Sequence, residues 1–184
     1  TNAIALAQNF AGLGQRVLLI EGDIRRRVYD QYFDLQSKKG LLSVISGDIG
    51  FAEAVQRSDL MDVDIIIAEK SIANPADVFS SRRFQDFMKS VREQYDVVIL
   101  DTPPVLVVPD ARVLAQVSDV VMYTVAWDQT SRHQVSEGIK QFEAGSVRVT
   151  GLILGQIDPK GMKRYGFGDR YGAYSSYGNA YFEA

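Results

Sequence analysis

Short runs of consecutive apolar residues, each followed by a polar or turn-forming segment, recur along the whole chain. The runs are RVLLIEGD, VDIIIAE, DVVILDTPP, VVMYTVAW and VTGLILGQID, at residues 16–23, 63–69, 96–104, 120–127 and 149–158. Strands that are apolar on both faces are typical of a parallel sheet covered by helices on each side. Two prolines end the third run, because proline cannot donate a hydrogen bond to a sheet. The pattern predicts five buried strands.

The segments between these runs carry the periodicity of amphipathic helices. In the longest, residues 74–95, apolar side chains recur at i, i+3, i+4 and i+7, namely at Phe84, Phe87, Met88 and Val91. Helices are also expected over residues 2–13, 40–48, 51–56, 109–119 and 131–143. Strands that alternate with helices indicate an α/β fold of three layers, with a mainly parallel sheet covered by helices on both faces.

The regular pattern stops near Asp158, where the composition of the chain changes. Residues 1–158 suffice for one domain with a sizeable core, whereas residues 159–184 are rich in glycine and tyrosine and carry no apolar periodicity. We therefore expect a domain followed by a mobile tail. The chain has no cysteine and a net charge of -3. Disulfides and thiolate metal sites are thus excluded, and nothing in the charge indicates nucleic acid as a partner.

Acidic residues stand at the carboxyl ends of three predicted strands. Glu21 and Asp23 follow the first of these strands, Asp101 ends the second and Asp158 follows the last. Ligands of such folds bind at this edge of the sheet, and carboxylates gathered there repel one another unless a cation lies among them. A single acid at a strand end is more simply interpreted as a cap of the next helix. Several acids on one edge favour a cation or phosphate site.

Two of these acidic segments resemble motifs of the bacterial tyrosine kinases. VVILDTPP, at residues 97–104, is very close to the Walker B motif of that family, and VLLIEGDIRR, at residues 17–26, resembles its Walker A′ motif. Residues 74–111 look like the family throughout, and a tyrosine-rich C-terminus is its hallmark. The resemblance is to the cytoplasmic kinase domain of polysaccharide co-polymerases, which control capsule and exopolysaccharide export. It implies a P-loop NTPase-like fold and a protein-tyrosine autokinase that uses ATP and Mg²⁺.

The P-loop of that family precedes its first helix, and Thr1 aligns with the residue that follows the Lys-[Ser/Thr] pair of the loop. The loop and the strand before it are therefore not among these 184 residues, and we expect the chain alone to bind ATP poorly and to be inactive. The resemblance puts four residues at the nucleotide, namely Thr1, Glu21, Arg25 and Asp158.

Glu21 departs from the family, which usually has aspartate at that position. Its extra methylene lengthens the side chain by roughly 1.5 Å, and octahedral Mg²⁺ tolerates little misplacement. Either Glu21 acts through a water molecule, or Asp23 carries the role alone.

Asp101 and Asp23 are the predicted catalytic and metal-binding residues. Asp101 is expected to hold Mg²⁺ through the water shell of the ion, and Asp23 to reach the same ion or the incoming phenol. A tyrosine with a pKa near ~10 needs a proton acceptor when it attacks at pH 7. The simpler alternatives are that Asp23 only caps a helix and that Asp101 only ends a strand.

Five tyrosines of the tail are the predicted phosphate acceptors, namely Tyr165, Tyr171, Tyr174, Tyr177 and Tyr181. Glycine and serine keep such a segment loose enough to enter an active site. The resemblance implies that this site belongs to a neighbouring subunit of a ring-like homo-oligomer. The alternative is an adhesive low-complexity segment that is never phosphorylated.

The resemblance further implies a membrane-anchored chain-length regulator region or an activator protein as partner, and a position in the cytoplasm at the inner face of the bacterial plasma membrane. Two other functions stay open. A MinD/ParA-like switch ATPase shares the motifs but does not explain the terminal tyrosines, and a degenerate regulatory domain would bind no nucleotide. Tyr29 and Tyr32 are expected to pack on the surface, and His133 is given no role.

Overall fold

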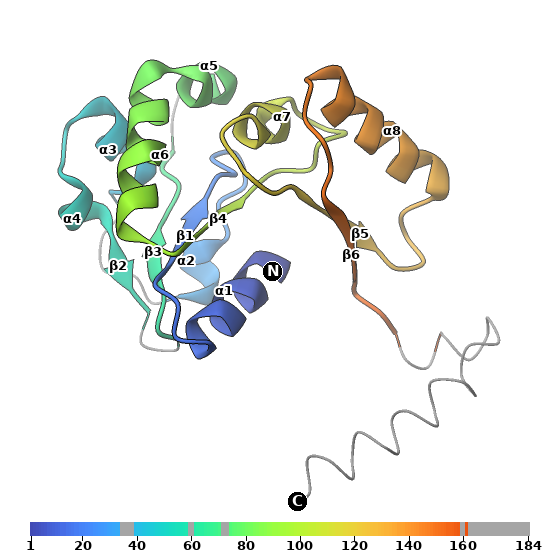
Figure 1. Ribbon diagram of the computed structural model, residues 1–184, viewed down its shortest axis with the longest axis horizontal. Coiled ribbons are helices and arrows are strands. Elements are labelled where there is room, and N and C mark those ends of the chain that lie inside the picture. Colours follow the sequence, from blue (N-terminus) through green and yellow to red (C-terminus); the bar gives the residue numbers. More distant parts are fainter. Residues whose placement is uncertain (34–38, 59–60, 71–73, 159–160, 162–184) are drawn as a thin grey trace, which may run out of the picture.

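The computed structural model describes residues 1–33, 39–58, 61–70, 74–158 and 161 (Figure 1). All five predicted strands form, as β1 (Val17–Glu21), β3 (Asp64–Ile66), β4 (Val97–Asp101), β5 (Met122–Ala126) and β6 (Gly151–Gly155), and a short β2 (Gln56–Arg57) was not predicted. The helices are α1 (Asn2–Gly12), α2 (Tyr29–Tyr32), α3 (Leu41–Ser46), α4 (Phe51–Ala54), α5 (Pro75–Ser80), α6 (Arg82–Gln94), α7 (Asp110–Ala115) and α8 (Arg132–Ala144).

The strands lie in two sheets. The larger has the order β2-β3-β1-β4, with β1 parallel to both β3 and β4 and with β2 antiparallel to β3; β5 and β6 form a separate parallel pair. The predicted α/β fold with a mainly parallel sheet is thus confirmed, but β4 and β5 are not hydrogen-bonded to each other in the described part of the chain. The apolar pattern identifies strands, and it does not specify which strands are neighbours.

The core is built on both faces of β1, whose five residues are all buried. Because side chains alternate along a strand, Leu18 and Ile20 point to one face and Leu19 to the other. The first face packs against α3, α6 and α7, and the second packs against α1 and Tyr29. Helices therefore cover the larger sheet on both sides, as predicted (Figure 1).

The helix predicted over residues 74–95 is broken at Ser81. Ser81 is extended, with φ -67° and ψ 151°, and separates α5 from α6. Its hydroxyl accepts a hydrogen bond from the amide of Phe84 at 3.2 Å. Serine is a favoured N-cap because its side chain satisfies an amide that has no partner inside the helix. Continuous periodicity in the sequence concealed this local start signal.

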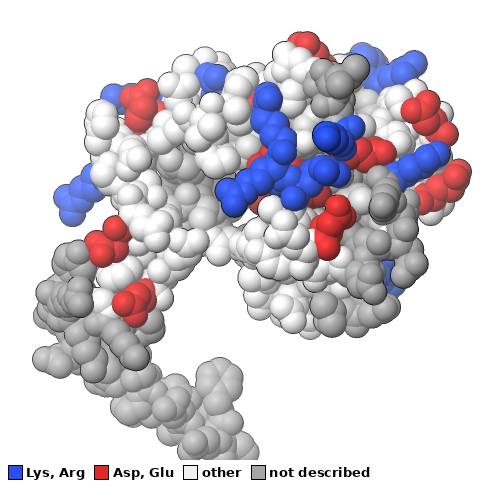
Figure 2. Space-filling view, turned by 180° about the vertical axis from the view of Figure 1, so that it is seen from behind, with Lys and Arg blue, Asp and Glu red and all other residues white. Residues whose placement is uncertain are grey.

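The prediction that every strand is buried on both faces is wrong for β5 and β6, and β4 is only partly buried along its whole length. One face of this pair packs on α8, where the Tyr123 and Phe142 rings lie 6.2 Å apart. Three large apolar side chains of the pair stay exposed, Met122 by 44%, Leu152 by 53% and Leu154 by 52%. None of the described helices is long and apolar enough to cross a membrane. On the face seen in Figure 2, several basic side chains gather near the middle of the molecule, with a few acidic side chains beside them.

Candidate active site

The carboxyl ends of β1 and β4 lie side by side. Glu21 is in register with Asp101, and the amide of Gly22 donates to the carbonyl oxygen of Asp101 at 2.7 Å, which extends the pairing by one residue. Burial raises the pKa of Asp101, hydrogen bonds from Tyr29 and Thr1 act in the opposite direction, and the charge of Asp23 raises it again. The predicted catalytic acids Asp23 and Asp101 thus stand at the ends of neighbouring strands, on one edge of the sheet.

One oxygen of Asp101 is held by hydroxyl groups. Its Oδ2 accepts from the Tyr29 hydroxyl at 3.0 Å and from the Thr1 hydroxyl at 3.2 Å. Thr1 also caps α1, since its Oγ1 accepts from the amide of Ile4 at 3.3 Å. Among the described residues no hydrogen bond reaches Oδ1 of Asp101. That oxygen remains available to a ligand at the sheet edge.

Asp23 combines a turn-closing role with a free oxygen. Its Oδ1 accepts from the amides of Arg25 and Arg26 at 3.1 Å and 2.8 Å. These bonds close a turn of the loop after β1, and the next helix begins only at Tyr29, with Val28 as its N-cap, so Asp23 is not a helix cap. Its Oδ2 makes no hydrogen bond with the part of the chain that the structure describes.

Glu21 is a structural anchor in this geometry. The residue is 2% exposed. Its Oε1 accepts from the amides of Val28 and Tyr29 at 2.6 Å and 2.9 Å, and its Oε2 accepts from the amide of Ala68 at 2.9 Å. Both oxygens are engaged by backbone groups, so the expectation that Glu21 reaches the nucleotide, directly or through water, does not match its contacts. The carboxylate instead joins β1 to the start of α2 and to the end of β3.

Arg25 and Asp158, also expected at the nucleotide, lie in different surroundings. The Arg25 guanidinium contacts both oxygens of Asp110, at 3.1 Å and 3.4 Å, and Asp110 is 1% exposed at the start of α7. Arg25 thus ties the loop after β1 to α7. Asp158 lies beyond β6 and accepts a hydrogen bond from the amide of Gly161 at 3.0 Å. A nucleotide contact by Asp158 stays a prediction, and the five tail tyrosines lie outside the described residues.

Tyr29 is the site residue that sequence reasoning missed. The prediction of surface packing is wrong, because Tyr29 has no exposed surface and its hydroxyl donates to Asp101. Three arginines precede it, and such charged surroundings indicate a solvated segment. In the sequence, only the glutamate at position 21, where the family usually has aspartate, could have indicated this contact. Its longer side chain can reach backbone groups farther along the chain.

The donor set fits a magnesium ion that is shared with phosphates. Among the described residues no group of three or more acidic, histidine or cysteine side chains is placed to hold a metal. Mg²⁺ commonly takes one or two carboxylates and completes its octahedron with waters and substrate phosphates. Asp101 and Asp23 supply two such carboxylates, so they fit this mode and not a metal cage made only of protein groups.

We expect Gly22→Ala to disturb the contact between β1 and β4. A Cβ at Gly22 would lie 2.8 Å from the carbonyl oxygen of Asp101 and 3.0 Å from Cδ1 of Leu114. Overpacking of this kind costs about 1–3 kcal/mol of unfolding free energy, which urea titration measures. Gly12→Ala is the control, because nothing lies within 4 Å of its Cβ and alanine favours a helix. Equal stabilities for the two variants would contradict the close approach at Gly22.

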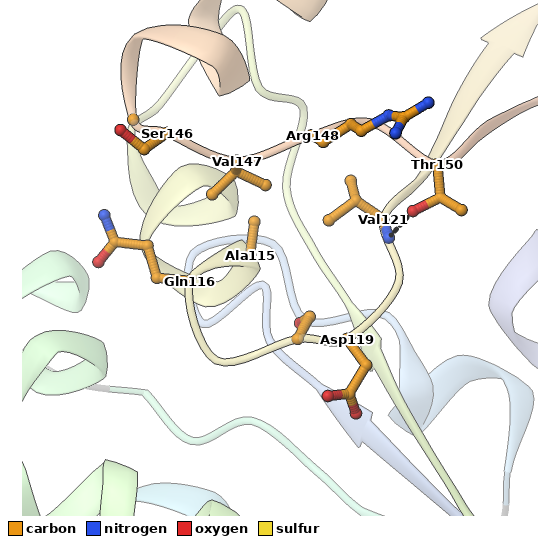
Figure 3. A pocket seen from close by; sticks show the side chains of 10 residues that line it. Ala115, Gln116, Asp119, Val121, Ser146, Val147, Arg148 and Thr150 are labelled. Carbon is orange, nitrogen blue, oxygen red and sulfur yellow. Dashed lines mark hydrogen bonds between the residues drawn. The ribbon is translucent and has the colours of Figure 1, made fainter.

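A cavity of about 580 Å³ lies elsewhere, before the amino ends of β5 and β6 (Figure 3). Its lining includes Val121, Thr150, Arg148 and Asp119. Asp119 already forms an ion pair with Arg92 at 2.6 Å. Ligands of α/β sheets bind at the carboxyl ends of the strands, so the edge that carries Asp23 and Asp101 is the stronger candidate site.

Comparison with known proteins shows which family the chain is similar to. Residues 1–148 match the AAA domain family. The putative tyrosine-protein kinase EpsB of Ralstonia nicotianae is 36% identical over 169 residues, which cover 92% of this chain and 22% of EpsB. The tyrosine-protein kinase YwqD of Bacillus subtilis is 30% identical over 91% of this chain and 70% of its own length. The chain thus spans about a fifth of EpsB and most of YwqD.

A solved structure shows the same similarity. The kinase domain of the Escherichia coli tyrosine kinase ETK superposes with a TM-score of 0.80 at 26% sequence identity, over 84% of this chain and 61% of that one. The AAA domain match covers most of the chain, and the chain covers more than two thirds of YwqD. This protein chain therefore belongs to the bacterial tyrosine kinases, a family with a P-loop NTPase-like fold.

Proposed function

We propose that the protein transfers the γ-phosphoryl group of ATP to tyrosines of its own C-terminal tail. The observation that carries this proposal is the pair of acids, Asp101 and Asp23, on adjacent strand ends, each with one carboxylate oxygen that makes no hydrogen bond within the described residues. EpsB and YwqD are named as tyrosine-protein kinases, which supports this chemistry. The proposed substrates are ATP and a peptidyl tyrosine.

Phosphoryl transfer depends on positioning and charge neutralisation more than on covalent chemistry by the protein. Mg²⁺ bound with ATP would supply much of this charge neutralisation. Asp101 would hold this ion through its free Oδ1, with a water molecule between them. The free oxygen of Asp23 would either reach the same ion or accept the proton of the tyrosine hydroxyl as that hydroxyl attacks. Thr1, beside Asp101, would lie near the phosphates.

The proposed acceptors are Tyr165, Tyr171, Tyr174, Tyr177 and Tyr181, and the proposed partner is a second copy of the chain in a ring-like assembly. By the resemblance, a membrane-anchored chain-length regulator or an activator protein would recruit this domain to the inner face of the bacterial plasma membrane. The tail would thereby regulate exopolysaccharide or capsule assembly. Each phosphate adds about -1.5 to -2 of charge, so phosphorylated tails of neighbouring subunits would repel one another.

Transfer between copies can be tested by mixing two variants, each expressed with whatever coding sequence precedes Thr1. One carries Asp101→Asn and an intact tail, and the other is otherwise unchanged but has the five tail tyrosines replaced by phenylalanine. After incubation with ATP and Mg²⁺, we expect peptide mass spectrometry to find phosphotyrosine on the tail of the Asp101→Asn partner.

Three other outcomes have distinct meanings. Phosphotyrosine in the unchanged protein alone, with none in the mixture, would support transfer within one chain. ATP consumption without phosphotyrosine would favour the switch ATPase. Absence of nucleotide binding by the unchanged protein would favour a regulatory domain.

A further inference from the structure

Tyr29 joins the two strand ends that carry the site. Its backbone amide donates to Oε1 of Glu21 at 2.9 Å, and its hydroxyl donates to Oδ2 of Asp101 at 3.0 Å. The side chain has no exposed surface, and its ring packs edge-on against Phe33 with the centroids 5.7 Å apart. One residue thus connects the end of β1 to the end of β4, through its backbone amide and its hydroxyl.

We propose that Tyr29 is a positioning residue that orients the Asp101 carboxylate toward the divalent cation, an inference that rests on the proposed function. The torsion that turns a carboxylate about its last bond has a broad profile. A donor fixed at Oδ2 removes this freedom, because the phenol is anchored at its own backbone. Oδ1, which accepts no hydrogen bond from the described residues, would then face the open edge of the sheet.

Thr1 cannot provide this orientation to the same degree. Its hydroxyl also donates to Oδ2 of Asp101, at 3.2 Å, but the Thr1 residue is exposed and its Oγ1 also accepts from an amide of α1. The Tyr29 hydroxyl is enclosed by protein, so water cannot take its place without a change of packing. A buried donor to a metal ligand commonly changes metal affinity about 10- to 100-fold when it is removed.

Glu21 holds Tyr29 in the position from which it contacts Asp101. It binds the amides of Val28 and Tyr29, and so fixes the backbone from which the phenol extends. The residue that departs from the family motif therefore supports Asp101 through Tyr29, and it does so without contacting the cation. A side chain one methylene longer than aspartate is suited to reach these amides.

The test is divalent cation binding by Tyr29→Phe, in the protein expressed with whatever coding sequence precedes Thr1. Mn²⁺ serves as the probe, and electron paramagnetic resonance measures free Mn²⁺ in the presence of ADP. We expect the dissociation constant of Mn²⁺ to rise about 10-fold. In kinase assays, the Mg²⁺ concentration for half-maximal rate should rise by a similar factor, while KM for the tyrosine substrate stays unchanged.

Tyr95→Phe is the matched control. The Tyr95 hydroxyl also donates to an aspartate, Asp64, at 2.7 Å, but this pair lies at the amino ends of β3 and β4. Its removal should leave Mn²⁺ binding unchanged. Urea titration of the same preparations gives the folded fraction, so that any loss of binding is corrected for unfolded protein.

The outcomes separate the two proposals. If the Tyr29→Phe variant binds Mn²⁺ as tightly as the unchanged protein and the Asp101→Asn variant does not, the proposed role of Tyr29 is overturned. The proposed function is then left intact. Asp101→Asn that also binds Mn²⁺ normally would remove the cation site on which both proposals depend. Equal weakening by Tyr29→Phe and Tyr95→Phe would assign the effect to general stability.

Discussion

Asp101→Asn is expected to slow tyrosine phosphorylation by about 10²- to 10³-fold. The substitution keeps the shape of the side chain and removes the charge that would hold the magnesium ion. Loss of metal-based charge stabilisation is worth several kcal/mol in a transition state, and each 1.36 kcal/mol is tenfold in rate. The measurement is the initial rate of phosphotyrosine formation at saturating ATP.

Asp64→Asn controls for the loss of a partly buried strand aspartate. Asp64 lies at the start of β3 and accepts a hydrogen bond from a tyrosine hydroxyl, as Asp101 does. It is remote from the carboxyl ends of the strands, so its variant should phosphorylate at nearly the normal rate. A rate for Asp101→Asn within twofold of the Asp64→Asn rate would show that the Asp101 charge is not used in catalysis.

Glu21→Ala is expected to lower the unfolding free energy by at least about 3 kcal/mol. Three backbone amides, those of Val28, Tyr29 and Ala68, would lose their acceptor in a region closed to water. An unsatisfied buried donor costs roughly 1–3 kcal/mol, and a whole domain has only about 5–15 kcal/mol. Urea unfolding followed by circular dichroism measures the change.

Two further variants isolate the cause. Glu69→Ala also removes a carboxylate that binds backbone, at the amide of Ser43, but Glu69 is only half-buried, so water can replace it and about 1 kcal/mol is expected. Glu21→Asp keeps the charge and shortens the reach, and it should lose most of the same stability. If Glu21→Asp were as stable as the unchanged protein, the length of the side chain would have no role.

The sequence predicted those elements of the fold that depend only on the pattern of neighbouring residues. Consecutive apolar residues identified β1, β3 and β4 because a strand covered by helices on both sides has no polar face. The same rule misjudged β5 and β6, where Met122, Leu152 and Leu154 are exposed. Burial depends on which elements lie opposite a strand, and a strand's own residues do not contain that information.

The site was likewise predictable only in part. Asp23 and Asp101 could be paired from the sequence, because parallel strands bring their carboxyl ends to one edge. The contacts of Glu21 and Tyr29 could not, since they depend on how the loop after β1 folds back upon the sheet. A buried carboxylate that binds amides and one that binds a metal look the same in a sequence.

The position of β1 between β3 and β4 has a consequence during synthesis on the ribosome. Val17 pairs with Val97, so 80 residues must be added after β1 before its second neighbour exists. At about 5–20 residues per second, this takes roughly 4–16 s. Throughout that interval one edge of β1 has no partner strand, and its apolar side chains are incompletely covered in the nascent chain. A molecular chaperone that shields this segment until β4 emerges would therefore raise the yield of folded protein.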